Sequence, residues 1–497
     1  MRMAPDLQRG LSLTRKTLWA ILLISLPVTS FPFFPGFMGL STAIVRPLAL
    51  YPLLLLLLLE VIPSIVQRKP LPAAAGPILA FCVAAAAATA FSMVTPPFPL
   101  AGQTPLSRAI RAFVTLGIGI GFLMTAWRMS TREHGGEFAA RWILIGSAAA
   151  LLWGGLQAIR LNTDWPGYEQ MNILHRLVSV RDMHIYRVTG LAYEPSWYAD
   201  YLVVLVFPLL LAALVTGVHP FGGNRWAPWI TGGWLAISLV NLLFTYSRGG
   251  IGVFIGLVLL LFLLVIVRRS RKGPSVSEEE EHLPDGLSRQ KSILRWAEIS
   301  LAVVVGLVVL GVVLVRNDYV RVVFSRLDRI GNLQNYLVSI GSGPRLALWQ
   351  AAFGVFLDRP FIGVGLGQSG FRMWDELPVW IFNYRSEIME TFASTSMGYP
   401  NPKNLWIRLL AETGILGISL FLLFLALVLL LALRAYWQGD RHERFIGLFG
   451  ILSLAAVVVE GVSLDSFANP TVWMAAGIVL GVLSGRDEPE ERQNDDG

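Results

Sequence analysis

The chain has 497 residues, of which 54% are hydrophobic and only 15% charged, and its mean hydropathy is +0.59. Soluble domains of this size do not carry so much apolar sequence, so the composition excludes a soluble enzyme and predicts an all-α polytopic membrane protein. The net charge of +7 is better explained by arginines that meet anionic lipid or an anionic substrate at a membrane surface than by nucleic acid.

Apolar runs long enough to cross the roughly 30 Å hydrocarbon core recur along the chain and predict about twelve transmembrane helices. The first run follows a basic start, and we expect it to be retained rather than cleaved as a signal peptide, because a second long apolar run follows it. The predicted spans are 17–35, 46–66, 73–94, 109–127, 141–159, 191–217, 227–245, 249–267, 297–315, 405–433, 444–463 and 469–484.

Loop charges predict the orientation of these helices. Four of the five lysines fall in loops on the side of the N-terminus, and Lys403 falls on the other side. Because basic loops stay in the cytoplasm, both termini are predicted to be cytoplasmic. The chain then divides into eight helices with an external segment at 160–190 (1–267), a flexible cytoplasmic linker (268–296), a ninth helix (297–315), a large external loop (316–404), three helices (405–485) and a disordered cytoplasmic tail (486–497).

The two long external segments are rich in arginine and aromatic residues and contain almost no lysine. Arginines outside the membrane are unexpected from the orientation rule, and their planar guanidinium groups bind phosphate with two parallel hydrogen bonds. The aromatic side chains beside them either stack on sugar rings or lie at the level of the lipid headgroups. Arg187, Trp349 and Arg359 are therefore candidate substrate-binding residues.

The turn at 245–250 (TYSRGG) places Tyr246, Ser247 and Arg248 between two apolar helices. An arginine there is costly unless it faces an aqueous or anionic site, and the neighbouring glycines let the backbone come close to a ligand. The alternative is an interfacial arginine that extends to the headgroups.

Glu194 stands directly before Pro195, where the first external segment enters a predicted helix. A carboxylate at the outer edge of the membrane suits a general base that deprotonates a sugar hydroxyl. The alternative is an acidic residue that only stabilises the start of the helix.

Asn404, Arg408 and Glu412 follow one another at i, i+4 spacing after Lys403. One face of the predicted helix therefore carries an amide, a guanidinium and a carboxylate, which suits substrate binding. The alternative is an Arg408–Glu412 ion pair that is satisfied within the helix bundle.

No metal or cofactor site is predicted. The single cysteine, Cys82, lies in an apolar run and excludes an intrachain disulfide and a thiolate metal cluster. The six histidines are scattered and form no HExxH motif. The glycine-rich run at 363–370 follows no βα unit, so it does not indicate a dinucleotide site.

The stretches at 245–250, 343–367 and 401–417, in this order and spacing, resemble the O-antigen ligase/polymerase superfamily, which includes Wzy-type polysaccharide polymerases. The resemblance implies a GT-C-type glycosyltransferase of the bacterial inner membrane with a large periplasmic loop. It also implies a glycan donor linked to undecaprenyl diphosphate, a lipid-linked or other glycan acceptor, and a reaction without metal, cofactor or nucleotide sugar. Arg248 and Arg345 match the arginines that hold the diphosphate in this superfamily.

Lys403 and Glu194 favour the polymerase branch of the superfamily. In the ligase branch a histidine stands at the place of Lys403, and a protonated lysine is a poor base. The stretch EPSWYA at 194–199 is similar to a segment of the polymerase branch, which implies that Glu194 is the acid/base. We therefore predict an inverting polymerase of O-antigen, exopolysaccharide or capsule repeat units, with Glu194, Arg248, Arg345 and Lys403 as catalytic residues. A flippase and a chain-length regulator are its expected protein partners.

Three alternatives stay open. One is an O-antigen ligase that transfers the lipid-linked glycan to another acceptor. A second is a polysaccharide-related transporter or flippase, in which Glu60 or Glu460 would be an ion site within the membrane. The long cytoplasmic linker follows the eighth predicted helix rather than the sixth, which disfavours a six-plus-six transporter. The third is a catalytically inactive scaffold for polysaccharide assembly.

Overall fold

The computed structural model describes residues 5–33, 45–131, 134–163, 165–223, 225–271, 335–336, 338, 342–384, 392 and 399–484. Within these ranges the chain is helical, and pairing between extended segments is limited to isolated bridges such as that of Ser30 with Ser179. The predicted all-α fold is confirmed. By length and composition, eight of the described helices could cross a membrane, and two apolar segments, Leu50–Val66 and Pro470–Ser484, are shorter.

The first half of the chain forms α1 (Pro5–Ser25), α2 (Leu50–Leu56), η2 (Leu57–Val61), α3 (Ile62–Val66), α4 (Ala75–Ser92), α5 (Pro105–Ser130), α6 (Gly135–Asn162), α7 (Tyr168–His175), α8 (Pro195–Tyr201), η3 (Leu202–Val206), α9 (Phe207–Thr216), α10 (Ala227–Phe244) and α11 (Arg248–Arg271). Most of these helices overlap the predicted apolar runs, but α1 ends at Ser25, well before the end of the predicted span 17–35, and α7 lies in no predicted run. The last turn of α11 extends four residues into the segment predicted as a linker, and residues 272–296 of that linker and the predicted span at 297–315 lie outside the described residues.

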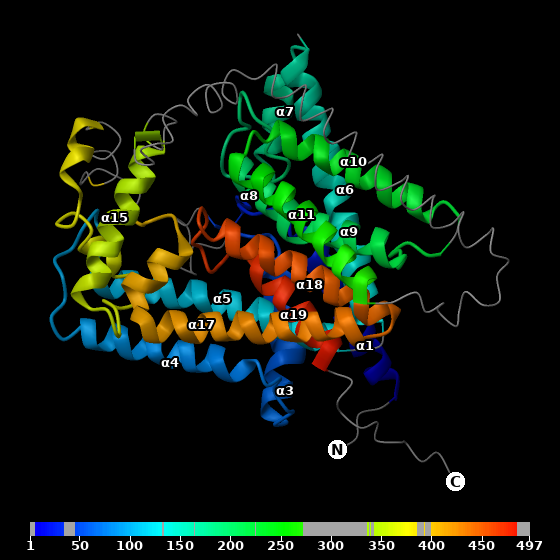
Figure 1. Ribbon diagram of the computed structural model, residues 1–497, viewed down its shortest axis with the longest axis horizontal. Helices are drawn as coiled ribbons and strands as arrows, with labels where there is room; N and C mark the ends of the chain where they lie inside the picture. Colours follow the sequence, from blue (N-terminus) through cyan, green and yellow to red (C-terminus); the bar gives the residue numbers. More distant parts are fainter. Residues whose placement is uncertain are drawn as a thin grey trace.

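The second half contains the large loop and the last three spans. Its elements are α15 (Gly343–Asp358), η5 (Ser369–Phe371), η6 (Val379–Tyr384), α17 (Leu405–Gln438), α18 (Arg441–Glu460) and α19 (Pro470–Ser484). Figure 1 shows α4, α5 and α17 running side by side, with α15 standing across the ends of these helices. The described part of the large loop is therefore attached to one end of the bundle.

Close approach of helix backbones holds the centre of the bundle together. The most extensive packing is that of α5 on α19 and of α17 on α18 and α4. A Cβ added at Gly477 of α19 would lie 2.6 Å from the Leu123 carbonyl oxygen of α5. Small residues at such contacts bring helices together, which matters where lipid removes the usual hydrophobic gain of association.

A separate small core fixes the loop to the bundle. Buried apolar side chains of α15 pack with Val364, Met373, Leu377 and Ile381, and this cluster also includes Ala411 of α17. Burial of such side chains contributes roughly 1.5–3 kcal/mol each. The described part of the loop is thus a folded unit that shares its core with the first turns of α17.

Candidate functional site

Helix α17 is broken at Gly414, and residues 360–365 of the loop form backbone hydrogen bonds with α17 on both sides of the break. Gly414 has φ 64° and ψ −169°, far from helical values. The Val364 and Gly365 amides donate to the Ala411 and Glu412 carbonyl oxygens, at 2.9 Å in both cases. On the other side of the break, the amide of Ile415 donates to the Pro360 carbonyl oxygen at 2.8 Å. The loop therefore satisfies the backbone groups that a broken membrane helix would otherwise leave unpaired.

Gly414→Ala is expected to lower the free energy of unfolding by about 2–4 kcal/mol, because a side chain there is strained and clashes. A Cβ at this position would lie 2.4 Å from the Phe361 carbonyl carbon. The measurement is the thermal unfolding midpoint of the purified protein in detergent. Gly252→Ala is the matched control, because Gly252 lies within α11 with no atom near its Cβ position. Equal midpoints for the two variants would contradict the break.

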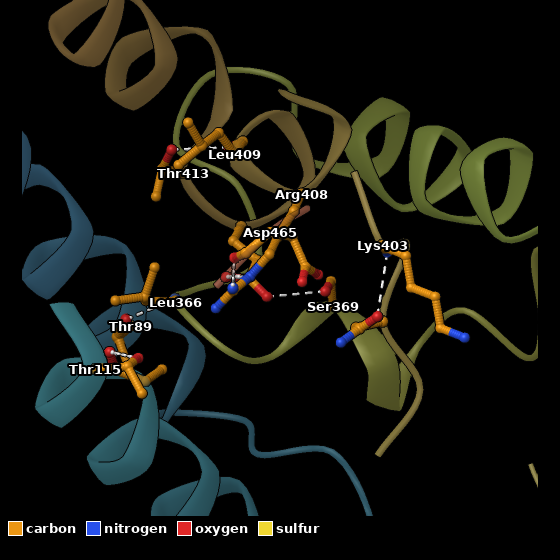
Figure 2. Close-up of polar contacts among 12 residues, drawn as sticks. Thr89, Thr115, Leu366, Ser369, Lys403, Arg408, Leu409, Thr413 and Asp465 are labelled. Atoms are coloured by element: carbon orange, nitrogen blue, oxygen red, sulfur yellow. Dashed lines mark hydrogen bonds and ion pairs between the residues drawn. The ribbon is translucent and has the colours of Figure 1, made fainter. Parts of the chain in front are cut away.

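Arg408 and Glu412 form a buried ion pair immediately before the break. The Arg408 Nε lies 3.1 Å from the Glu412 Oε2, and the two side chains are only 8% and 3% exposed. Arg408 also donates through Nη1 to the Asp465 carbonyl oxygen at 2.6 Å. The Ser369 hydroxyl donates to the other carboxylate oxygen of Glu412 at 2.9 Å, as Figure 2 shows. The pair thus links α17, the loop and the connection between α18 and α19.

Further polar groups surround this ion pair. The guanidinium of Arg108, in the first turns of α5, lies 4.2 Å from the centre of the Tyr399 ring. Burial raises the pKa of the Asp465 carboxyl above its usual value and raises that of the Tyr399 phenol well above its usual value. One buried polar atom in each of Arg108, Tyr399 and Asp465 has no hydrogen-bond partner among the described residues. Such atoms commonly bind water or a polar ligand.

Asn404 and Lys403 differ in what their side chains do. The Asn404 side-chain oxygen accepts from the Trp406 and Ile407 amides at 3.0 and 3.2 Å, so it is the N-cap of α17. Lys403 has a positive φ of 49°, and its amide donates to the Asn401 side chain at 3.1 Å. The Lys403 side chain is exposed and points away from Arg408 and Asp465 (Figure 2). Its ammonium group is therefore presented outside the buried cluster.

The turn at 245–250 forms the start of α11. The Ser247 hydroxyl accepts from the Gly250 amide at 3.3 Å, which makes Ser247 the cap, and Arg248 is the first helical residue. Tyr246 has a positive φ of 48°, and the centre of its ring lies 6.3 Å from the centre of the Phe244 ring. Arg187 donates through Nε to the Thr245 carbonyl oxygen at 2.7 Å. Arg187, Tyr246, Ser247 and Arg248 are thus brought together.

Glu194 is held by a different set of contacts. It is the residue directly before α8, and its side chain makes no capping hydrogen bond to the amides of that helix. Its Oε1 lies 2.8 Å from the Arg181 Nη1, with side chains 38% and 44% exposed. The Ser196 hydroxyl donates to Oε2 at 3.4 Å. The carboxylate is therefore accessible from the solvent and paired with an arginine of the segment 160–190.

The predicted residues of α15 lie at its two ends. Arg345 is exposed in the first turn, and Trp349 follows one turn later with a buried indole nitrogen that has no partner among the described residues. Arg359 directly follows the helix, and its guanidinium lies 5.3 Å from the centre of the Phe91 ring of α4. Burial first, and then the nearby charge of Arg359, lower the pKa of Arg372. Two arginines, Arg359 and Arg372, therefore lie close to each other and to Asp358, the last residue of α15.

Glu460 is a buried carboxylate at the end of α18, close to the start of α11. It is 5% exposed, and it accepts from the Ser463 hydroxyl through Oε2 at 3.2 Å. A Cβ added at Gly249, next to Arg248, would lie 3.9 Å from the Glu460 Oε1. Arg345 is close enough to Glu460 for their charges to interact. Glu460 therefore lies against the start of α11 and within electrostatic range of Arg345.

Sequence reasoning missed several of these residues. Asp200 is buried in α8 and accepts from Asn469 and Thr471, both at 2.9 Å. Asp465 and Arg108 flank the buried ion pair. An acidic residue inside an apolar run, as at Asp200, was a signal that could have been used. Among the described residues there is no group of three or more potential ligands that could hold a metal ion.

Comparison with known families matches the part of the chain that contains several of these elements. Residues 233–422 match the family model described as O-antigen ligase. No curated protein matches the chain. The matched stretch contains the turn with Arg248, the helix with Arg345 and the ion pair of Arg408 with Glu412.

Proposed function

We propose that this chain, whose residues 233–422 match the family model described as O-antigen ligase, polymerises oligosaccharide repeat units carried on undecaprenyl diphosphate. The reaction takes place at the periplasmic face of the inner membrane, where the large loop lies. It inverts the anomeric configuration and needs no metal ion.

The position of Arg248 and Arg345 carries this proposal. Both arginines stand in the first turn of a helix, Arg248 in α11 and Arg345 in α15, where free backbone amides and the helix dipole favour an anion. Glu460 lies next to the start of α11 and within electrostatic range of Arg345. Two guanidinium groups, each at a helix N-terminus, supply the kind of charge that a diphosphate requires.

The transfer step requires a base and a stabilised leaving group. The acceptor hydroxyl attacks the anomeric carbon of the donor, and the bond from that carbon to the diphosphate oxygen breaks. The diphosphate leaves with the electron pair. Arg248, Arg345 and the exposed Lys403 stabilise the negative charge that develops on it. Glu194 takes the proton of the acceptor hydroxyl. Its exposure allows it to meet a glycan that arrives from the periplasm.

An O-antigen ligase is the second candidate, and the description of the matched family favours it. The exposed Lys403 argues for the polymerase, because an ammonium group outside the buried cluster supplies charge rather than a base. The lipid-linked glycans of a deletion strain distinguish the two. Loss of a polymerase leaves single repeats on lipid and on the final acceptor, whereas loss of a ligase leaves long polymer on lipid.

Glu194→Gln is expected to leave the fold intact and to slow polymerisation by about 10²–10⁴-fold, the usual contribution of a general base. Cells with this variant should accumulate single lipid-linked repeats, measured by mass spectrometry of extracted lipids. Glu169→Gln is the control, because Glu169 is an exposed carboxylate of α7 in the same external segment. Polymer of wild-type length from Glu194→Gln would exclude Glu194 as the base.

A further inference from the structure

A cleft of about 990 Å³ opens in the external segment between α7 and α8. Its lining includes two tyrosines, two arginines, an aspartate and a histidine: Tyr168, Arg176, Arg181, Asp182, His184 and Tyr186. Neither the superfamily resemblance nor the matched residues 233–422 include this cleft.

We propose that this cleft binds the acceptor oligosaccharide and brings its terminal hydroxyl to Glu194. The inference rests on the proposed function, to which it adds the place and the chemistry of acceptor recognition. Arg181 lines the cleft and holds the Glu194 carboxylate at 2.8 Å. Arg181 therefore joins the cleft to the residue assigned as the base.

The charged groups of the cleft can bind hydroxyl groups as donors and as acceptors. Arg176 donates through Nη2 to Asp182 at 2.9 Å, and both side chains remain more than half exposed, at 62% and 54%. The hydrogen bond from Arg176 lowers the pKa of the Asp182 carboxyl, so the carboxylate stays an acceptor. A sugar hydroxyl both donates and accepts, and it can bridge such a pair without separating it.

His184 contributes a neutral donor. Burial first, and then the charges of Arg187 and Arg181, lower the pKa of its imidazole, which keeps the ring neutral at pH 7. Its Nδ1 accepts from the Tyr186 amide at 3.2 Å, so the neutral ring carries its proton on Nε2. The lining arginines are balanced by Asp182 and by Glu194. This balance suits a glycan of uncharged sugars better than a polyanion.

Aromatic rings give the cleft surfaces for sugar rings. Tyr186 is 75% exposed beside the cleft. Tyr168 is held in place, because its hydroxyl donates to the Met183 carbonyl oxygen at 2.9 Å and its ring lies 4.6 Å from the Arg160 guanidinium. Rings with a polar end are suited to ligands that are apolar on one face and hydroxylated at the edge.

The same segment is also joined to the turn that is proposed to hold the donor. The Val188 amide donates to the Phe244 carbonyl oxygen at 2.9 Å, and Arg187 donates to the Thr245 carbonyl oxygen at 2.7 Å. An acceptor in the cleft would therefore enter next to the start of α11, where Arg248 stands.

The test measures acceptor and donor kinetics separately with the full-length protein in proteoliposomes. The donor is the lipid-linked oligosaccharide extracted from a strain that lacks the gene. The acceptor is the same oligosaccharide on a short alkyl chain without diphosphate, which can accept but cannot donate. Tyr186→Ala and Arg176→Ala are expected to raise the KM for the acceptor about tenfold and to leave the KM for the donor unchanged. A single lost contact has an effect of this size.

Two substitutions on α7 outside the cleft lining, Gln170→Ala and Ile173→Ala, are the controls and should keep both KM values. Unchanged acceptor KM in the cleft variants, with transfer still abolished by Arg248→Ala, would overturn the cleft assignment and leave the proposed function standing. A raised donor KM would also overturn it. No transfer by the wild-type protein would refute the proposed function itself.

Discussion

Arg408→Ala is expected to destabilise the protein by about 3–5 kcal/mol, because it leaves a buried carboxylate without its partner. The Glu412 side chain is only 3% exposed, and Arg408 is its ion-pair partner at 3.1 Å. The Asp465 carbonyl oxygen would also lose a donor. The expected result is a sharply lowered thermal unfolding midpoint in detergent and a low yield of folded protein.

Two further variants separate charge from packing. Arg434→Ala removes an exposed arginine from the far end of the same helix and should have little effect. The double substitution Arg408→Met with Glu412→Leu removes both charges and should cost less than Arg408→Ala alone. An unfolding midpoint of Arg408→Ala equal to that of wild type would mean that the ion pair does not stabilise the break in α17.

Arg248→Ala and Arg345→Ala are each expected to reduce transfer by about 10²–10³-fold, the usual effect of removing one group that stabilises a leaving oxyanion. Both side chains are at least partly exposed, so their loss should leave the fold intact. Lysine at either position should restore part of the activity, because it keeps the charge but not the two parallel hydrogen bonds. The measurement is the length distribution of the polymer in cells with matched protein levels.

Arg225→Ala is the control for these variants. Its guanidinium lies 5.3 Å from the centre of the Trp226 ring, next to the start of α10, and it belongs to neither helix start of the candidate site. We expect wild-type polymer from this variant. Full-length polymer from Arg248→Ala or Arg345→Ala would contradict the assignment of that arginine to the diphosphate.

The helical fold follows from the sequence because lipid forces the backbone to satisfy its own hydrogen bonds. Apolar runs therefore mark helices well: the predicted span 227–245 and the observed helix Ala227–Phe244 are nearly the same. The break in α17 could not be predicted in this way. The run from 405 to 433 has the pattern of one continuous helix, with Arg408 and Glu412 at i, i+4 spacing. The helix breaks at Gly414 because residues 360–365, distant in sequence, supply the missing hydrogen bonds.

The candidate site was only partly visible from the sequence for the same reason. The i, i+4 spacing of Arg408 and Glu412 predicted that they share a helix face, and the structure pairs them. The spacing could not show that Ser369 and Asp465 complete the cluster, since these contacts are made between distant segments. Glu460 was considered only as an ion site for a transporter, yet it lies beside the start of α11 and interacts with Arg345.

The glycine-rich run at 363–370 shows how a local motif depends on its surroundings. Its glycines allow positive φ at Gly363, Gly365 and Gly367, where the chain passes close to α17, α4 and α5. The Leu366 amide donates to the Thr89 hydroxyl at 2.8 Å. The glycines therefore allow the loop to run close to the backbones of these helices.

The most direct test of the account is the release of undecaprenyl diphosphate by purified protein in liposomes that contain only the lipid-linked repeats, with a metal chelator and without nucleotide. We expect one lipid diphosphate released for each new glycosidic linkage, together with a ladder of longer glycans, and neither product from Arg248→Ala. Repeats that stay at single length, with no lipid diphosphate released by the wild-type protein, would contradict the proposed transfer.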